Sequence, residues 1–256
     1  MVEVTYGLDA ISALNDEGSS GSNGPEFTSF KSGTTFKVKV LGIHDLSAEY
    51  TYGIFKKVNS FAATKPSRKS AKGNPIGDYT PWDLAWKYHK DKSDDWQDEH
   101  GQEASKYRPS QRFAFGFIDL ETGEPIIIDL SKKQGQVVYP VIQRNEKRLD
   151  KRYFELSKTG TGMNTVVMMS AEDLEDLTDK EREHFDNAPK EFDKEALQKV
   201  WIRKTKEEQV ELLKEAGFDV SLIGFDPNKD KSEEKTSEPP KQEIEDKEND
   251  DPTSQF

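Results

Sequence analysis

The segment Thr34–Leu41, TTFKVKVL, alternates strictly between apolar and polar side chains. Successive side chains of a β-strand point to opposite faces, so its phenylalanine and valines share one face and its two lysines share the other. The pattern predicts a strand with one face against a core. Similar runs recur along the chain, and we therefore expect a fold that is mainly β with helical additions.

Further strand patterns follow in a recognisable order. They occupy 50–61, broken by Gly53, then 111–120, 126–130, 153–156 and 166–169. A loop-rich insertion and a helix opening at Thr80-Pro81 precede the strand pair, and a second helix is expected from about Pro140. The order strand, strand, insertion, strand pair, helix, strand, strand predicts an OB-fold-like Greek-key barrel, a fold that binds oligonucleotides across one face and through its loops.

The same pattern divides the chain into four parts. An N-terminal arm and linker (1–26) precede an OB-fold core (27–170), which carries an insertion at about 64–110. A helical appendage (171–225) follows, with capping boxes at Thr178 and Thr205 and a left-handed cap residue at Gly217. Residues 226–256 form a predicted disordered acidic tail, because they hold many acids and few large apolar residues.

Composition excludes several classes of protein. The 256 residues include no cysteine, which excludes disulfides, thiolate zinc sites and a cysteine nucleophile. The histidines are scattered, so no metal or cofactor is expected. The first thirty residues lack a signal-peptide pattern, and no apolar run approaches the roughly 20 residues needed to span a bilayer. A cytoplasmic protein without a membrane partner is expected.

The net charge of −12 hides an asymmetry. Residues 31–160 carry 23 Lys and Arg against 17 Asp and Glu, whereas the remaining residues carry 14 against 32. An acidic tail on a basic binding domain produces such a distribution. The competing interpretation is an ordinary domain with a solvated acidic surface.

The strongest local signal is Tyr50–Gly77, which contains no acid. Cations and aromatic rings are interleaved in it and continue beyond it. Single-strand binders use cations to follow phosphates and aromatic faces to stack bases, and each stacked base contributes about 1–3 kcal/mol whatever its identity. The predicted single-strand contacts are Lys37, Lys39, Tyr50, Tyr52, Phe55, Lys56, Lys57, Phe61, Lys65, Arg68, Lys69, Lys72, Trp82, Trp86, Tyr88, Lys106, Tyr107, Arg108, Arg112, Arg144, Lys147, Arg148, Lys151, Arg152, Tyr153 and Lys158.

Two roles are assigned within this set. The cations of 56–72 and 144–158 are expected to contact phosphates, and the tyrosines and tryptophans of 50–107 to stack bases. The alternative is that the rings belong to the core and the lysines keep the surface soluble. That alternative gives no reason for the acid-free run.

A glycine-rich turn, Lys158-Thr159-Gly160-Thr161-Gly162, separates two strand patterns. It matches the K-T-G box of β-lactamases, but that box needs an S-x-x-K nucleophile and an S-D-N partner, and the chain has no S-D-N. In a phosphate-binding Walker A loop the lysine follows the glycines and a helix comes next. Here the lysine precedes them and a strand follows, so the stretch predicts a β-hairpin rather than an enzyme site.

The tail ends in DDPTSQF, which places acids and an aromatic ring beside a terminal carboxylate. Such an end can enter an apolar pocket with a basic rim on a partner. Asp250, Asp251 and Phe256 are therefore the predicted partner-binding residues. The tail is also expected to lie in the protein's own basic groove until nucleic acid displaces it.

Three stretches together carry a resemblance. FKSGTTFKVKVLG, YFELSKTGTGMNTVVMMS and the acidic tail ending in phenylalanine resemble the replication single-stranded-DNA-binding proteins of large tailed phages. The resemblance implies an OB-fold core, sequence-tolerant and cooperative ssDNA binding, no enzymatic activity, and a tail that recruits replication and recombination proteins. It also implies roles in DNA replication, recombination and repair in the host-cell cytoplasm. Members that bind zinc do so through cysteines, which this chain lacks.

Two other classes of function remain open. An RNA-binding regulator would use the 2′-hydroxyl and prefer RNA over DNA of the same sequence. A scaffold or assembly protein would bind other proteins through its acidic helices and show no affinity for oligo-dT at low salt.

Overall fold

The computed structural model describes residues 25–225, so the predicted tail and the N-terminal arm up to residue 24 lie outside the described residues. The strands are β1 (Thr35–Lys39), β2 (Leu46–Ile54), β3 (Val58–Ala63), β4 (Arg68–Lys69), β5 (Pro75–Gly77), β6 (Ser110–Asp119), β7 (Pro125–Ser131), β8 (Arg152–Thr159), β9 (Val166–Asp173) and β10 (Arg203–Lys204). The helices are α2 (Pro81–Lys90), α3 (Glu99–Tyr107), α4 (Lys132–Arg144), α5 (Asp179–Asn187), α6 (Lys194–Lys199) and α7 (Lys206–Glu215), with short 3-10 turns that include η4 (Val220–Ile223). Within this part of the chain no helix is both long and apolar enough to cross a membrane.

The fold is mixed α/β and centres on one large, open, mostly antiparallel sheet of eight strands. The strand order is β10-β3-β2-β6-β1-β8-β9, and β7 pairs with β6 beside this path. β6 pairs with β2 through residues 110–115, with β1 at 118–119 and with β7 through 112–118. β6 is therefore the strand that connects the largest number of neighbours.

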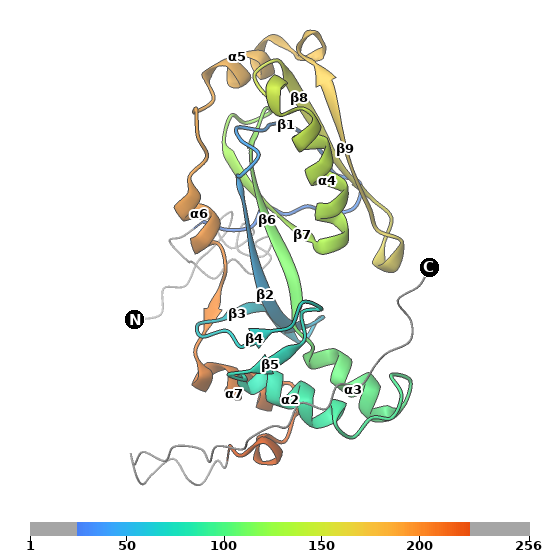
Figure 1. The fold of residues 1–256 in the computed structure, drawn as a ribbon. Helices are drawn as coiled ribbons and strands as arrows, with labels where there is room; N and C mark the ends of the chain where they lie inside the picture. The colour runs from blue at the N-terminus through green and yellow to red at the C-terminus, as the bar shows by residue number, and fades with distance from the viewer. Residues whose placement is uncertain (1–24, 226–256) are drawn as a thin grey trace, which may run out of the picture.

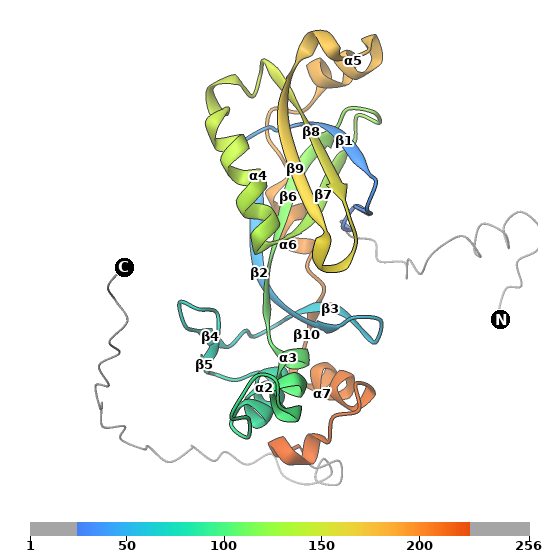
Figure 2. The same cartoon turned by 90° about the vertical axis from the view of Figure 1, so that its right-hand side faces the viewer.

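The molecule is elongated, and β2 and β6 run along it between α4 at one end and helices α2 and α7 at the other (Figures 1 and 2). Among the described residues, the two largest of four hydrophobic cores are built from the elements of these two ends. The first core lies under α4 and contains Phe117, Phe154 and Val138. The second core lies between β2, β3 and helices α2, α3 and α7, and it contains Trp82 and Leu213. Each core is built from segments far apart in the sequence.

The predicted OB-fold-like Greek-key barrel is wrong. Barrel closure removes sheet edges by pairing them, but in the described part of the chain β9 pairs only with β8 and β10 only with β3. Helix α4 packs against both β7 and β9 and buries Val138 and Ile142 there. The helix therefore contacts both strands, and the two strands do not pair with each other, so the sheet stays open.

The insertion and the appendage also differ from expectation. The insertion at about 64–110 is an integral part of the fold. It contributes the β4–β5 hairpin, α2 and α3, and its helices build the second core. The appendage contains the expected helices, but β10 also pairs in parallel with β3 and α7 buries Val210 and Leu213 beside α2. These two regions stabilise each other.

Local capping signals are confirmed. Thr80 caps α2 with Pro81 at its first position, and Thr178 and Thr205 form the expected capping boxes. Gly217 takes the left-handed conformation, with φ of +84°. The expected start of the next helix near Pro140 is wrong, because Ser131 and Gln134 form a capping box that starts α4 at Lys132 instead.

The glycine-rich turn is a hairpin, as predicted. β8 and β9 pair continuously from Arg152↔Asp173 to Thr159↔Val166. Gly160 and Gly162 both have positive φ, +75° and +57°, a region that side chains with a Cβ disfavour. The turn therefore has a structural reason for its glycines.

Replacing each of the two glycines with alanine distinguishes the cost of a positive φ angle from the cost of a steric clash of the new Cβ. A Cβ at Gly160 would lie 2.1 Å from the Asn164 carbonyl oxygen, whereas nothing lies within 4 Å of one at Gly162. We expect Gly162→Ala to lower the free energy of unfolding by about 1 kcal/mol and Gly160→Ala to lower it by more than about 2 kcal/mol. Urea denaturation checks this, and equal losses at both positions would contradict the close approach of Asn164 to Gly160.

Candidate nucleic-acid interface

Three adjoining hollows follow β2 and β6 between the two cores. The first, of about 350 Å³, lies beside the β2–β3 turn, and the second, of about 500 Å³, lies between the β4–β5 loop and the first turn of α4. The third, of about 390 Å³, lies between α4 and β6. The first two share Arg108 and Arg112, and the last two share Lys132. We call this continuous surface the β6 trough.

Six cations line the β6 trough, and Asp129 is the only acid among the residues that line its three hollows. The cations come from four separate segments: Lys56, Lys72, Arg108 with Arg112, and Lys132 with Lys133. Figure 2 shows how this happens, because the β4–β5 hairpin and the lower end of α4 lie on the same side of β2 and β6. A hollow lined by one sign of charge concentrates ions of the opposite sign.

Aromatic rings accompany the cations. Phe55 stands at the β2–β3 turn with 89% of its surface exposed, and the Lys56 amine lies 5.5 Å from its ring centre. Tyr50 lines the second hollow, and Phe113 and Tyr139 line the third. A basic surface with spaced rings can hold a strand by its phosphates and its bases.

The first turn of α4 adds to the positive potential. Ser131 caps the helix by accepting a hydrogen bond from the Gln134 amide, and the first turn contains no acid. Every other α-helix of the described chain has an acid in its first turn. A helix N-terminus is itself partly positive, so Lys132 and Lys133 raise the local potential further, and an anion bound there would relieve the repulsion.

Arg112 and Asp129 form a two-pronged ion pair across β6 and β7. The Arg112 Nε and Nη2 atoms lie 2.9 and 2.7 Å from the Asp129 Oδ1 and Oδ2 atoms. Both side chains are about one-third exposed, so the pair adds little stability. A phosphate offers the same arrangement of two oxygens, so it can compete with Asp129 for the arginine.

Several rings that the sequence assigned to base stacking are sealed in the protein. Tyr52, Phe61, Trp82, Tyr107 and Tyr153 are each less than 5% exposed. The first four pack on one another in the second core, where apolar burial stabilises the fold, and Tyr153 packs with Leu120 and Phe185. These five rings cannot stack on bases in this structure, which corrects the prediction for them.

Lys69 is also buried, and its contacts stabilise the fold. Its amine contacts the Tyr52 hydroxyl at 3.0 Å and the Asp83 carboxylate at 3.2 Å, and the Asp83 side chain has no exposed surface. Burial lowers the pKa of the Lys69 ammonium, while the Asp83 charge raises it. The pair connects the β4–β5 hairpin to the start of α2.

Other predicted cations are held by the protein away from the trough. Lys37 pairs with Glu181, and Lys39 donates to the Phe185 carbonyl. Arg152 pairs with Asp173, and Lys158 donates to the Phe30 carbonyl. These contacts tie β1 and β8 to their surroundings.

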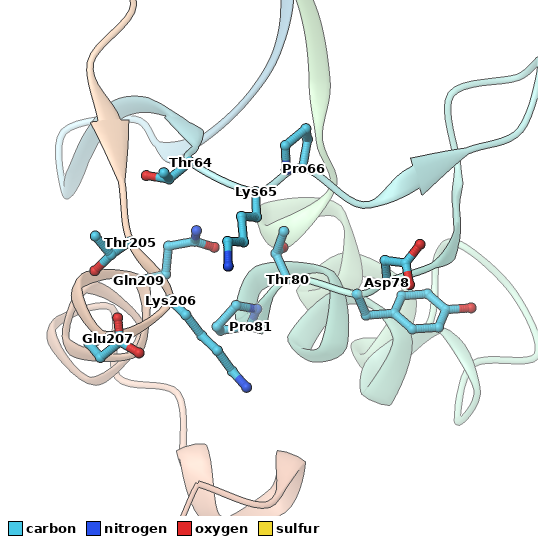
Figure 3. A pocket seen from close by; sticks show the side chains of 11 residues that line it. Thr64, Lys65, Pro66, Asp78, Thr80, Pro81, Thr205, Lys206, Glu207 and Gln209 are labelled. Carbon is cyan, nitrogen blue, oxygen red and sulfur yellow. The ribbon is translucent and has the colours of Figure 1, made fainter. Parts of the chain in front are cut away.

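The basic cluster Arg144, Lys147, Arg148 and Lys151 lies at the opposite end of α4 from Lys132. The 13-residue helix is about 20 Å long, so the cluster is roughly that far from Lys132 and Lys133. Its first member, Arg144, donates to the carbonyl of Pro140 at 3.1 Å and so lies one turn from the residues that line the third hollow. The remaining predicted residues lie around the second core. Lys57 donates to the Ala216 carbonyl, Arg68 pairs with Asp78, Lys106 pairs with Glu103, Lys65 lines a different cavity (Figure 3), and Trp86 and Tyr88 pack partly exposed.

The structure thus brings together Tyr50, Phe55, Lys56, Lys72, Arg108 and Arg112 from the predicted set. It adds Lys132, Lys133, Phe113 and Tyr139, which the sequence analysis missed. The sequence analysis missed the two lysines because it predicted that the helix starts near Pro140 instead of at Lys132. A start at Ser131 would have placed them at a helix N-terminus without an acid, and that pattern is readable in the sequence.

Within residues 25–225 no group of three or more His, Asp and Glu side chains is placed to hold a metal. The predicted partner-binding residues Asp250, Asp251 and Phe256 lie outside the described residues. No protein-family model, curated protein or solved structure matches the chain.

Lys69→Met tests the assignment of this lysine to the fold. It leaves the Asp83 carboxylate buried without its cation, so we expect the free energy of unfolding in urea to fall by about 3 kcal/mol. The matched control is Lys72→Met, a nearby exposed lysine, with an expected change within about 0.5 kcal/mol. Equal effects of the two substitutions would show that Lys69 is not a structural residue.

Asp129→Asn tests the competition for Arg112. Removing the carboxylate charge frees the arginine and leaves no acid in the trough, so we expect oligo-dT affinity at low salt to rise three- to tenfold, about 1 kcal/mol. Fluorescence anisotropy with a labelled oligo-dT measures the change. Glu124→Gln, an exposed acid on the loop before β7, is the control and should leave the affinity unchanged.

Proposed function

We propose that this chain binds single-stranded DNA along the β6 trough without reading its sequence. The single observation that supports this most is the composition of the trough, which carries six cations, the exposed ring of Phe55, three half-buried rings and one acid on one continuous surface. Cations that follow phosphates and rings that stack bases bind a strand by chemistry that every nucleotide shares.

The shape of the trough favours an unpaired strand over a duplex. Phe55 projects from a turn between two strands, and the third hollow is walled by Phe113, Tyr139, Leu46 and Pro140. Apolar and aromatic walls of this kind contact base faces, and base faces are accessible only where bases are unstacked. The phosphates of the same strand would lie against Lys132, Lys133 and Arg112.

We further propose a non-enzymatic role in phage DNA replication, recombination and repair. The resemblance of the hairpin and tail sequences to replication ssDNA-binding proteins supports it. In this proposal the trough covers and organises the strand, and the tail recruits replication and recombination proteins. Binding of neighbouring copies along the strand belongs to the same proposal.

A salt titration with oligo-dT tests the proposal. Each phosphate contact on a single strand contributes about −0.7 to the slope of log affinity against log salt concentration, so six cations predict a slope near about −4. Lys132→Ala with Lys133→Ala should weaken binding at least tenfold and make the slope shallower by one to two. The matched control, Lys147→Ala with Arg148→Ala, removes the same charge at the far end of α4 and should change affinity less than twofold.

The same titration distinguishes single-stranded DNA binding from the two alternative functions, RNA binding and a protein scaffold. Much tighter binding to oligo-U than to oligo-dT would indicate an RNA-binding protein. The absence of appreciable oligo-dT binding at low salt would refute the proposed function and favour a scaffold. Equal losses in the two double variants would place the strand outside the trough.

A further inference from the structure

Two histidines meet where α2 and α3 lie side by side at one end of the molecule (Figures 1 and 2). His89 lies in the last turn of α2, and His100 lies in the first turn of α3. Their Nδ1 atoms are 3.0 Å apart, which is a hydrogen-bonding distance. One Nδ1 must therefore carry a proton and the other must accept it, so at least one of the two rings is neutral in this contact.

The half-buried His89 ring lies between aromatic side chains. It stacks on Tyr107, the last residue of α3, with ring centres 5.9 Å apart and planes inclined by 5°. Phe218, after α7, meets it edge-on at 5.8 Å, and Tyr107 is itself only 4% exposed. The His89 ring thus contacts α3 near both of its ends, and a charge on this ring would be partly desolvated.

The groups around His89 oppose its protonation. Burial is the largest cause that lowers its pKa below the ordinary value of about 6.5. His100 and Lys106 on α3 and Lys92 in the loop after α2 lower the pKa further, whereas Glu103 on α3 raises it. Glu103 already pairs with Lys106, so it does not offer His89 an uncommitted counter-charge.

We propose that the His89–His100 pair is an acid-sensitive latch between α2 and α3. The neutral pair keeps its hydrogen bond, and so does the pair with one added proton. A second added proton makes both rings cations and places a donor on each Nδ1, so repulsion replaces the hydrogen bond and the two helices lose this contact.

The latch is connected to the β6 trough through the end of α3. Arg108 directly follows Tyr107, lines the first two hollows of the trough, and donates from Nη2 to the Asn74 Oδ1 atom at 3.2 Å. When His89 leaves Tyr107, α3 loses the contact that holds its end, and Arg108 shifts with it. This second step rests on the proposed function, and it predicts weaker binding of single-stranded DNA in acid.

The direction of the pH dependence follows from the lowered pKa of His89. The unfolded chain protonates this side chain near about pH 6.5, whereas the folded protein keeps it neutral to lower pH. Below about pH 6.5 the unfolded or opened state binds more protons, so the stability of the closed pair falls as the pH falls. One extra proton increases the opening constant by up to about tenfold per pH unit.

Hydrogen exchange of the full chain at about pH 7.5 and about pH 5.5, corrected for the intrinsic rate at each pH, tests the latch. We expect the protection of the α3 amides to fall at least about tenfold in the wild type at the lower pH. His100→Gln keeps a hydrogen-bonding partner for His89 and removes one of the two charges, so the fall should be less than about threefold. His44→Gln, an exposed histidine in the turn before β2, is the control and should behave like the wild type.

The affinity for oligo-dT at the same two pH values tests the connection to Arg108. It should fall at least about fivefold more in the wild type than in His100→Gln. Equal loss of α3 protection in these two proteins, or no loss in either, would overturn the latch. Loss of protection with equal changes in oligo-dT affinity would overturn the connection to the trough. A chain that binds no oligo-dT at about pH 7.5 would refute the proposed function and the connection with it, and hydrogen exchange would still decide the latch.

Discussion

The pairing of β2 with β6 is the constraint on which the rest of the molecule depends. Six consecutive residue pairs, Leu46↔Phe115 to Thr51↔Ser110, join a core under α4 to a core around Trp82. Since neither strand can shift register without exchanging its buried and exposed faces, the relative positions of the two cores follow from this one ladder. The β6 trough lies where the ladder leaves the first core and enters the second.

The trough is consequently a product of long-range packing. Lys56 reaches it from a strand turn, Lys72 from the β4–β5 loop, and Lys132 from a helix start. The buried Lys69–Asp83 pair holds the hairpin that carries Lys72, and Ser131 fixes the helix start that carries Lys132. A buried cation, Lys69, therefore positions an exposed one, Lys72, in the trough.

The sequence correctly predicted those features of the fold that depend only on residues close together in the chain. The alternation in 35–39, the β8–β9 hairpin with its two glycines, and the capping boxes at Thr80, Thr178 and Thr205 all follow from local chemistry. The open sheet did not follow, because closure depends on pairing between strands that are far apart in the sequence. The buried rings did not follow either, since Tyr50 and Tyr52 look alike in sequence and only packing on α2 separates them.

The acid-free run from Tyr50 to Gly77 illustrates how one sequence signal can have several causes. Lys69 is there to neutralise Asp83, Arg68 to pair with Asp78, and Lys57 to reach the Ala216 carbonyl. Lys56 and Lys72 line the trough, and Lys65 lines a separate cavity between α2 and α7. An acid in place of Lys57, Arg68 or Lys69 would meet a carbonyl oxygen or a carboxylate. The run is free of acids because separate electrostatic requirements coincide in one segment, and a single binding channel accounts for only two of its six cations.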